Sequence, residues 1–361
     1  MQQHEPAQRA GGDDAAQSIH RAANLIRDNV ARVIVGAEDT VTMVLVAVFA
    51  HGHVLLEDVP GTGKTVLARA LAQSTRSDIS RIQCTPDMLP GDITGSSIIE
   101  TKSMKFVFRP GPVFANVLLV DEINRATPKT QSALLEAMME GAVTIEGNTH
   151  RLPKPFFVLA TQNPVELAGT FPLPEAQLDR FLFKLSVGYP DHDAERLVMR
   201  GNAISLAVDD LEPVVATKEV VDMMRLASEV DLPEAVETYI IDVVQATRSD
   251  PALTLGAGPR ASINLVKASR VMAAADGRDT VYPEDVKSIL TPCLNHRMML
   301  TPDAVLRGET VEDVVERVTS RIKVPLGVKS GTAPQAESGP KRRTTKRATS
   351  YRRTRRGASV K

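Results

Sequence analysis

The residues whose chemistry is easiest to assign lie in a short loop, 60–65, with the sequence Pro-Gly-Thr-Gly-Lys-Thr. Its two glycines let consecutive backbone N–H groups turn inward around an anion, which a Cβ atom would obstruct. We expect a strand over 53–57 before the loop and a helix over 65–74 after it, and the helix N-terminus adds partial positive charge. Lys64 would then reach the β- and γ-phosphates of a nucleotide, and the Thr65 hydroxyl would bind Mg²⁺.

The loop departs from the full phosphate-binding pattern at Asp58, where that pattern has a glycine. Aspartate adopts unusual backbone angles more readily than most residues, so the departure weakens the match without removing it. An ordinary turn is the alternative interpretation, which the flanking strand and helix disfavour. The residues expected to bind ATP here are Asp58, Val59, Pro60, Gly61, Thr62, Gly63, Lys64, Thr65 and Val66.

Two adjacent carboxylates, Asp121 and Glu122, follow a second apolar strand expected over 117–120. Side chains at the carboxyl end of a parallel strand face the ligand crevice. We expect Asp121 to order the water shell of Mg²⁺ and Glu122 to polarise the attacking water as a general base. The alternative is a solvated pair of acids, which the phosphate loop upstream disfavours.

A neutral amide, Asn163, ends the next apolar run at 157–160 within the sequence Thr-Gln-Asn-Pro. Beside the γ-phosphate such an amide would position the water and sense phosphate loss. Asparagine before proline is also common in plain turns. The order of the three motifs along the chain favours the catalytic interpretation.

The elements that would position these residues alternate between short apolar runs and helical patterns. Continuously apolar runs such as 117–120 and 157–160 are typical of strands buried on both faces. Further strands are expected over 53–57, 81–84 and 181–187, and the first helices over about 19–33 and 38–50. The alternation predicts an α/β P-loop NTPase fold, a three-layer sandwich with helices on both faces of a parallel sheet.

The second half of the chain is almost entirely helical in pattern. Helices are expected over 193–200, 217–228, 233–247, 259–275 and 283–294. We therefore expect an α/β nucleotide-binding domain over 16–188, followed by an all-α lid domain over 189–328.

Both ends of the chain, residues 1–15 and 329–361, lack apolar periodicity, and we expect them to be disordered. The C-terminal segment has eleven Lys and Arg residues and one acid, although the net charge of the whole chain is −1. A basic tail therefore follows an acidic body.

The composition is that of a soluble globular protein, with 43% hydrophobic and 24% charged residues. The most apolar run, 41–50, is too short to span a bilayer, and the polar opening of the chain does not resemble a signal peptide. Cys84 and Cys293 lie too far apart in sequence to indicate a disulfide framework or a zinc site. We expect a protein without a transmembrane segment, in the cytoplasm.

Four sequence runs together resemble the MoxR branch of the AAA+ ATPases. They are Phe-Arg-Pro-Gly-Pro-Val-Phe-Ala-Asn at 108–116, Asp-Glu-Ile-Asn-Arg-Ala at 121–126, Thr-Gln-Asn-Pro at 161–164 and Leu-Pro-Glu-Ala-Gln-Leu-Asp-Arg-Phe at 173–181. The runs occur in the order of that family, and the similarity covers roughly residues 19 to 325.

The resemblance implies a homo-oligomer, most often a hexameric ring. Arg180 matches the arginine finger, which acts on ATP bound to the neighbouring subunit and contributes on the order of 10³–10⁵ in rate in other NTPases. Arg260, after Pro259 in the first turn of a lid helix, matches the residue that touches phosphate from the same subunit. For Arg125, contact with a neighbouring subunit and a local salt bridge both remain open.

Two insertions also fit the resemblance. Residues 86–103 correspond to a segment that interrupts the helix after the second strand. Residues 143–155 read as a hairpin that turns at Gly147 and Asn148. In relatives both segments project toward the pore of the ring.

The resemblance implies ATP-driven, chaperone-like remodelling, assembly or cofactor insertion in partner complexes. The implied partner contains a von Willebrand factor A domain, which this chain lacks. The alternative is a DNA-acting AAA+ motor that binds phosphate backbones through the basic tail. That tail has one aromatic residue, Tyr351, and no DNA-binding fold is evident before it. A non-hydrolysing scaffold is disfavoured because Lys64, Asp121 and Glu122 are chemically competent.

Overall fold

A computed structural model of the chain describes residues 10–57, 62–101, 104–163, 169–189, 192, 195–196 and 208–325. Residues 58–61 of the phosphate loop, most of the helix expected over 193–200 and the basic tail lie outside this described part. No helix in the described part combines the length and hydropathy needed to cross a bilayer.

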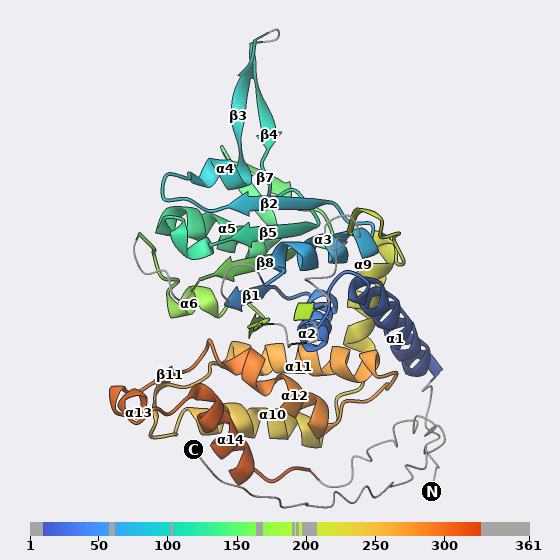
Figure 1. Cartoon of the computed structure of the whole chain (residues 1–361), viewed down its shortest axis with the longest axis vertical. Coiled ribbons are helices and arrows are strands. Elements are labelled where there is room, and N and C mark those ends of the chain that lie inside the picture. Colours follow the sequence, from blue (N-terminus) through green and yellow to red (C-terminus); the bar gives the residue numbers. More distant parts are fainter. Residues whose placement is uncertain are drawn as a thin grey trace, which may run out of the picture. The chain divides into compact units, whose positions relative to one another are not determined.

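Five parallel strands form the central sheet in the order β2-β5-β8-β1-β9 (Figure 1). They are β1 (Val54–Glu57), β2 (Ile79–Gln83), β5 (Val117–Asp121), β8 (Phe157–Gln162) and β9 (Phe183–Leu185). All five residues of β5 are buried, as expected for a central strand covered on both faces. Because the strands are parallel, their carboxyl ends lie along one edge of the sheet.

Two buried clusters cover the two faces of this sheet. Leu119 belongs to the first cluster and its neighbours Leu118 and Val120 to the second, as the alternation of side chains along a strand requires. Helices α1 (Ala10–Ala31), α2 (Glu38–Phe49) and α3 (Lys64–Ser74) contribute to the first cluster, and α5 (Pro128–Glu140) contributes to the second. The predicted three-layer sandwich is confirmed.

Two antiparallel hairpins interrupt the alternating pattern. After α4 (Pro90–Thr94), strands β3 (Gly95–Glu100) and β4 (Lys105–Pro110) form a hairpin that projects away from the sheet (Figure 1). Strands β6 (Ala142–Ile145) and β7 (Asn148–Arg151) form the second hairpin.

The second hairpin was expected, but its turn lies one residue earlier than predicted. Glu146 and Gly147 are the turn residues, and both have positive φ, of 51° and 80°. Two consecutive positive φ values match the right-handed twist of the flanking strands. Asn148 is already paired with Ile145.

The second half of the described chain is mostly helical, as predicted. It contains α9 (Thr217–Leu226), α10 (Glu234–Thr247), α11 (Pro259–Ala275), α12 (Pro283–Leu294), α13 (Pro302–Leu306) and α14 (Val311–Arg321), with a short 3₁₀ turn η2 (Ala227–Glu229). The small sheet of β10 (Leu253–Leu255) and β11 (Met299–Leu300) was not predicted, because each strand is too short to show a period of two.

Helix α1 begins within the segment that was expected to be disordered. It starts at Ala10, and Ala15 and Ala16 are buried. The first turns of the helix are rich in alanine and glycine, which contribute little to a hydrophobic pattern. The start of the helix was therefore not predicted from the sequence. Helices α1 and α2 both pack against α11, so one buried cluster runs from the sheet into the helical lid.

Candidate functional site

A pocket of about 250 Å³ lies at the carboxyl edge of the sheet. Its lining includes the end of the phosphate loop, the start of α3, the carboxyl ends of β5 and β8 and the residues that follow them: Thr62, Gly63, Lys64, Thr65, Val66, Asp121, Glu122, Thr161, Gln162 and Asn163. The three sequence motifs therefore meet in one place, because parallel strands bring their carboxyl ends together.

The described end of the phosphate loop has the backbone that an anion cradle requires. Gly63 precedes α3 with φ of 81°, in the left-handed region that favours glycine. A Cβ atom at this position would meet nothing within 4 Å, so the glycine serves the backbone angle and not a close approach. The N-terminus of the 11-residue α3 adds its partial positive charge beside Lys64 and Thr65.

The oxygen atoms of Thr65 and Asp121 suit Mg²⁺. A hydroxyl and a carboxylate are hard oxygen ligands, and Mg²⁺ in nucleotide sites usually takes one or two protein ligands together with phosphates and waters. No cluster of three His, Cys, Asp or Glu residues that could hold a metal occurs in the part of the chain that the structure describes. The donor set therefore fits a metal that arrives with a nucleotide.

The carboxylate of Asp121 forms an ion pair with Arg81. The Arg81 Nε atom lies 2.7 Å from Asp121 Oδ2, and Asp121 is 9% exposed. Arg81 comes from β2, the neighbour of β5 in the sheet. A guanidinium therefore stands beside the carboxylate that would face the metal.

Glu122 adopts a strained backbone and has several polar contacts. Its φ of 55° and ψ of 52° lie in the left-handed region, which is uncommon for residues other than glycine. Its N–H donates to the Thr161 hydroxyl at 2.9 Å. Gln83 donates to its carboxylate at 3.0 Å, and Arg125 does so at 2.9 Å. Arg125 thus forms a local salt bridge within this subunit.

Three residues of the pocket were not predicted as site residues from the sequence: Arg81, Gln83 and Thr161. Arg81 and Gln83 alternate with buried Ile82 on an edge strand, a pattern that is equally typical of a solvated surface. The pairing of β2 with β5 sets Gln83 opposite Asp121. This pairing brings Arg81 and Gln83 to the pocket.

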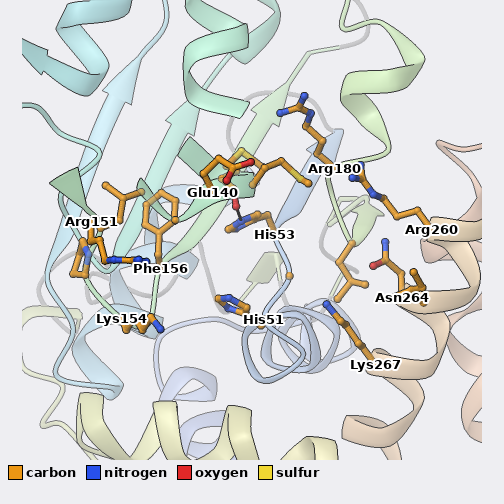
Figure 2. A pocket seen from close by; sticks show the side chains of 18 residues that line it. His51, His53, Glu140, Arg151, Lys154, Phe156, Arg180, Arg260, Asn264 and Lys267 are labelled. Carbon is orange, nitrogen blue, oxygen red and sulfur yellow. Dashed lines mark hydrogen bonds between the residues drawn. The ribbon is translucent and has the colours of Figure 1, made fainter. Parts of the chain in front are cut away.

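Arg180 and Arg260 line a different cavity, of about 380 Å³ (Figure 2). Its lining includes His53, Phe156 and Leu182, which directly precede β1, β8 and β9. This cavity therefore lies at the amino edge of the sheet, opposite the nucleotide pocket. Strands of three to six residues separate the two edges by roughly 10–20 Å.

Arg260 lies away from the position expected for it from the sequence. Arg260 was expected to touch phosphate bound to its own subunit, yet it does not line the nucleotide pocket. Its guanidinium instead lies 3.4 Å from the Asp179 carboxylate. The reason is the packing of α11 against α1 and α2, which places the start of α11 at the amino edge of the sheet.

Buried Arg297 joins the end of α12 to the segment that carries Arg180. Its side chain is 1% exposed, lies 2.8 Å from Asp179 Oδ1 and donates to the Asp179 carbonyl at 3.1 Å. It also donates to the carbonyls of Phe181 and Leu182. The Arg180 guanidinium donates to the Leu135 carbonyl at 2.7 Å, which anchors it to the end of α5.

Family models match two stretches of the chain. The first, residues 53–183, matches the ATPase family associated with various cellular activities, and the second, residues 245–318, matches the AAA lid domain.

Several known proteins are similar over nearly their whole length. The uncharacterized protein YeaC of Bacillus subtilis is 48% identical, over 86% of this chain and 97% of that protein. Chaperone MoxR1 of Mycobacterium tuberculosis is 40% identical, over 87% and 85% respectively, and protein MoxR of Methylorubrum extorquens is 30% identical, over 87% and 98%. The solved structure of a candidate ATPase from Cytophaga hutchinsonii superposes with a TM-score of 0.81 at 37% identity, over 87% of this chain and 98% of that one.

Proposed function

The chain belongs to the MoxR family of AAA+ ATPases and is an ATP-hydrolysing enzyme, and from this premise we propose that the pocket at the carboxyl edge of the sheet is its catalytic centre. The observation that carries the proposal is the meeting of Lys64, Thr65, Asp121, Glu122 and Asn163 in that single pocket.

Each of these residues has a distinct role in the proposed hydrolysis. The backbone around Gly63 and the Lys64 ammonium bind the phosphates, while Thr65 and Asp121 hold Mg²⁺. When bound, Mg²⁺ neutralises charge on the β- and γ-phosphate oxygens. Glu122 accepts a proton from the attacking water, and the Asn163 amide orients that water.

We propose that Arg180 and Arg260 serve the ATP of a neighbouring subunit. Both line the cavity at the amino edge, and neither lines the nucleotide pocket of its own subunit. A homo-oligomeric ring, hexameric by family resemblance, would bring that cavity against the next nucleotide. The finger role of Arg180 follows the sequence expectation, whereas the same role for Arg260 replaces the expected contact within one subunit.

We further propose that hydrolysis drives chaperone-like remodelling of a partner complex. This proposal is supported by the relative in Mycobacterium tuberculosis, which is named a chaperone and is 40% identical to this chain. The γ-phosphate in such machines holds two parts of the protein together, so its loss moves them. A partner with a von Willebrand factor A domain, and assembly or cofactor insertion as the outcome, follow from the family resemblance.

The catalytic assignment is tested with Glu122→Gln. This substitution removes the proton acceptor but keeps the size of the side chain, so we expect ATP hydrolysis to fall by about 10²–10⁴ while ATP binding persists. Lys64→Ala should weaken binding itself. Glu316→Gln, an exposed acid on α14, is the matched control and should leave both unchanged. Near-normal hydrolysis by Glu122→Gln would refute the assignment.

The shared site is tested by mixing two inactive proteins. Lys64→Ala lacks nucleotide affinity but keeps its arginines, while Arg180→Ala has the opposite defect. In mixed rings some interfaces contain both intact halves, so hydrolysis should partly return. Absence of any recovery, with mixed assembly demonstrated by tagged subunits, would contradict a site shared between subunits.

The same Glu122→Gln protein, held in its ATP state, is the bait with which to capture the partner complex.

A further inference from the structure

The cavity at the amino edge of the sheet has more positive charge than two trans-acting arginines require. Its lining contains five Lys and Arg side chains and a single acid, Glu140. The cations come from separate parts of the fold: Arg151 from β7, Lys154 from the loop after it, Arg180 from the segment before β9, and Arg260 and Lys267 from α11. Figure 2 shows them around one space.

Three of these cations, which we name the outer set, are Arg151, Lys154 and Lys267. Within the described part of the chain, no ion pair or side-chain hydrogen bond involves any of them. Arg260, by contrast, is paired with Asp179. All three are exposed, and like charges gathered at one cavity raise its positive potential, which favours the binding of an anion there.

His51, which lines the cavity, lies close to two of these cations. Burial lowers the pKa of His51, and the charges of Lys267 and Lys154 lower it further. These two lysines belong to different elements, yet both act on the same imidazole. Lys154 and Lys267 therefore lie near the same imidazole, and Arg151 lines the same cavity.

One face of α11 supplies much of the cavity wall. Arg260, Asn264 and Lys267 recur at helical spacing and line the cavity. Arg260 lies in the first turn, where the partial positive charge of the helix N-terminus adds to its own. The volume of about 380 Å³ lies within the range of small-molecule sites, about 300–1,000 Å³. Five cations spread around such a volume suit a chain of several phosphates better than a single small anion.

We propose that this cavity is a polyphosphate-binding site in which the outer set, Arg151, Lys154 and Lys267, extends the contact made by Arg180 and Arg260. The phosphate chain has two possible sources. One is the ATP of a neighbouring subunit, in which case the inference rests on the proposed ring function. The other is a free polyphosphate compound, which needs no ring.

The first arm of the test measures binding directly. Inorganic tripolyphosphate is titrated by calorimetry, at low salt, into full-length protein with Lys64→Ala, so that the nucleotide pocket contributes little. Adding Arg151→Gln, Lys154→Gln and Lys267→Gln should weaken binding by at least about tenfold, because three charge-assisted contacts are lost. The control replaces exposed Lys218, Lys287 and Lys323 by Gln, which changes the net charge equally but lies outside the cavity.

The second arm identifies the source. In the otherwise native protein, a fall in ATP hydrolysis for the outer-set variant that is relieved by mixing with Lys64→Ala identifies the neighbour's ATP. Weakened tripolyphosphate binding with unchanged hydrolysis identifies a free polyphosphate. If the outer-set and control variants bind tripolyphosphate equally, or if the Lys64→Ala protein does not bind it at all, the site is refuted. Loss of wild-type hydrolysis would refute only the proposed function, because the binding arm does not depend on it.

Discussion

At the residue scale, two carboxylates of the proposed catalytic pocket form ion pairs with arginines of the protein itself. Arg81 pairs with Asp121 and Arg125 pairs with Glu122, at 2.7 and 2.9 Å. Both arginines are partly exposed, so water screens the pairs and each contributes little to stability. The Arg81 guanidinium would compete with a metal ion for the carboxylate oxygens of Asp121.

We predict that Arg81→Gln lowers the Mg²⁺ concentration needed for tight nucleotide binding by a few fold. The reason is that Asp121 loses the cation that competes for its oxygen atoms. The measurement is titration of a fluorescent ATP analogue at a series of Mg²⁺ concentrations. Arg225→Gln, which removes an exposed pair with Glu229 on the lid, is the control and should leave the Mg²⁺ dependence unchanged. A higher Mg²⁺ requirement in Arg81→Gln would mean that Arg81 assists binding.

Buried His53 makes stability depend on pH in a defined direction. Burial lowers its pKa to about 4, from an ordinary value of 6.5. Its Nδ1 atom accepts from the Val158 N–H at 3.1 Å, so Nε2 carries the proton and faces the Met138 carbonyl. The folded protein therefore holds the neutral imidazole, whereas the unfolded chain takes up a proton below about 6.5.

We predict that the free energy of unfolding falls as pH decreases from about 6.5 to about 4, by up to about 3 kcal/mol from His53 alone. His51 and His296 act in the same direction, since their pKa values are also lowered by burial. The His53→Gln variant should be less stable at pH 7.5 but show a shallower decline. Urea denaturation at several pH values measures both, and parallel curves for the two proteins would contradict the assignment.

At the scale of elements, α1 connects the α/β layer with the lid. It packs against α2 and α3 of the α/β layer and against α9 and α11 of the helical second half. Its apolar face includes Ile19, Ile26 and Val30, all almost fully buried. A helix at the start of the chain is thus part of the core.

We predict that Ile26→Ala lowers the free energy of unfolding by about 2–5 kcal/mol, because it leaves a cavity where a side chain is 1% exposed. The preceding residue offers a matched control. Leu25 is 51% exposed on the same helix, so Leu25→Ala should change stability by less than about 0.5 kcal/mol. Equal effects of the two substitutions in thermal or urea denaturation would show that α1 does not pack as described.

The two hairpins form another connection between elements. The Phe108 ring on β4 stacks on His150 of β7 at 4.0 Å between ring centroids, and it contacts Phe114 edge-on at 5.5 Å. Beyond this contact the β3–β4 hairpin is exposed and apolar, with Phe106 at 70% and Met104 at 75%. The Phe108–His150 stacking is therefore a direct contact between the two hairpins.

At the scale of the whole molecule, one buried cluster extends from the sheet into the lid, and this predicts cooperative unfolding. Cys84 and Cys293 are both buried, and burial raises the pKa of their thiols to about 12 and about 11. Cys84 lies beside β5 and Cys293 lies in α12, so the two thiols report on different parts of the same unit.

We predict that neither thiol reacts with a maleimide in the native protein and that both become reactive over the same range of urea concentration. Two single-cysteine proteins, Cys84→Ala and Cys293→Ala, report each position separately by mass spectrometry. Reaction of Cys293 at a lower urea concentration than Cys84 would show that the lid opens independently of the sheet.

The sequence by itself determined which residues meet at the carboxyl edge of the sheet. Lys64, Asp121 and Asn163 each follow or precede an apolar run at a fixed spacing, and parallel strands align their carboxyl ends whatever their order. That local rule predicted the pocket, while the alternation of apolar runs with helical patterns predicted the three-layer fold and the helical patterns after it predicted the lid.

Only the tertiary structure decided what lies beside that pocket and what lies opposite it. The pairing of β2 with β5 brings Arg81 to Asp121, and the packing of α11 on α1 and α2 carries Arg260 to the amino edge of the sheet. Strand order and helix docking depend on which apolar faces bury each other across long stretches of chain. Spacing along the sequence carries no record of that choice.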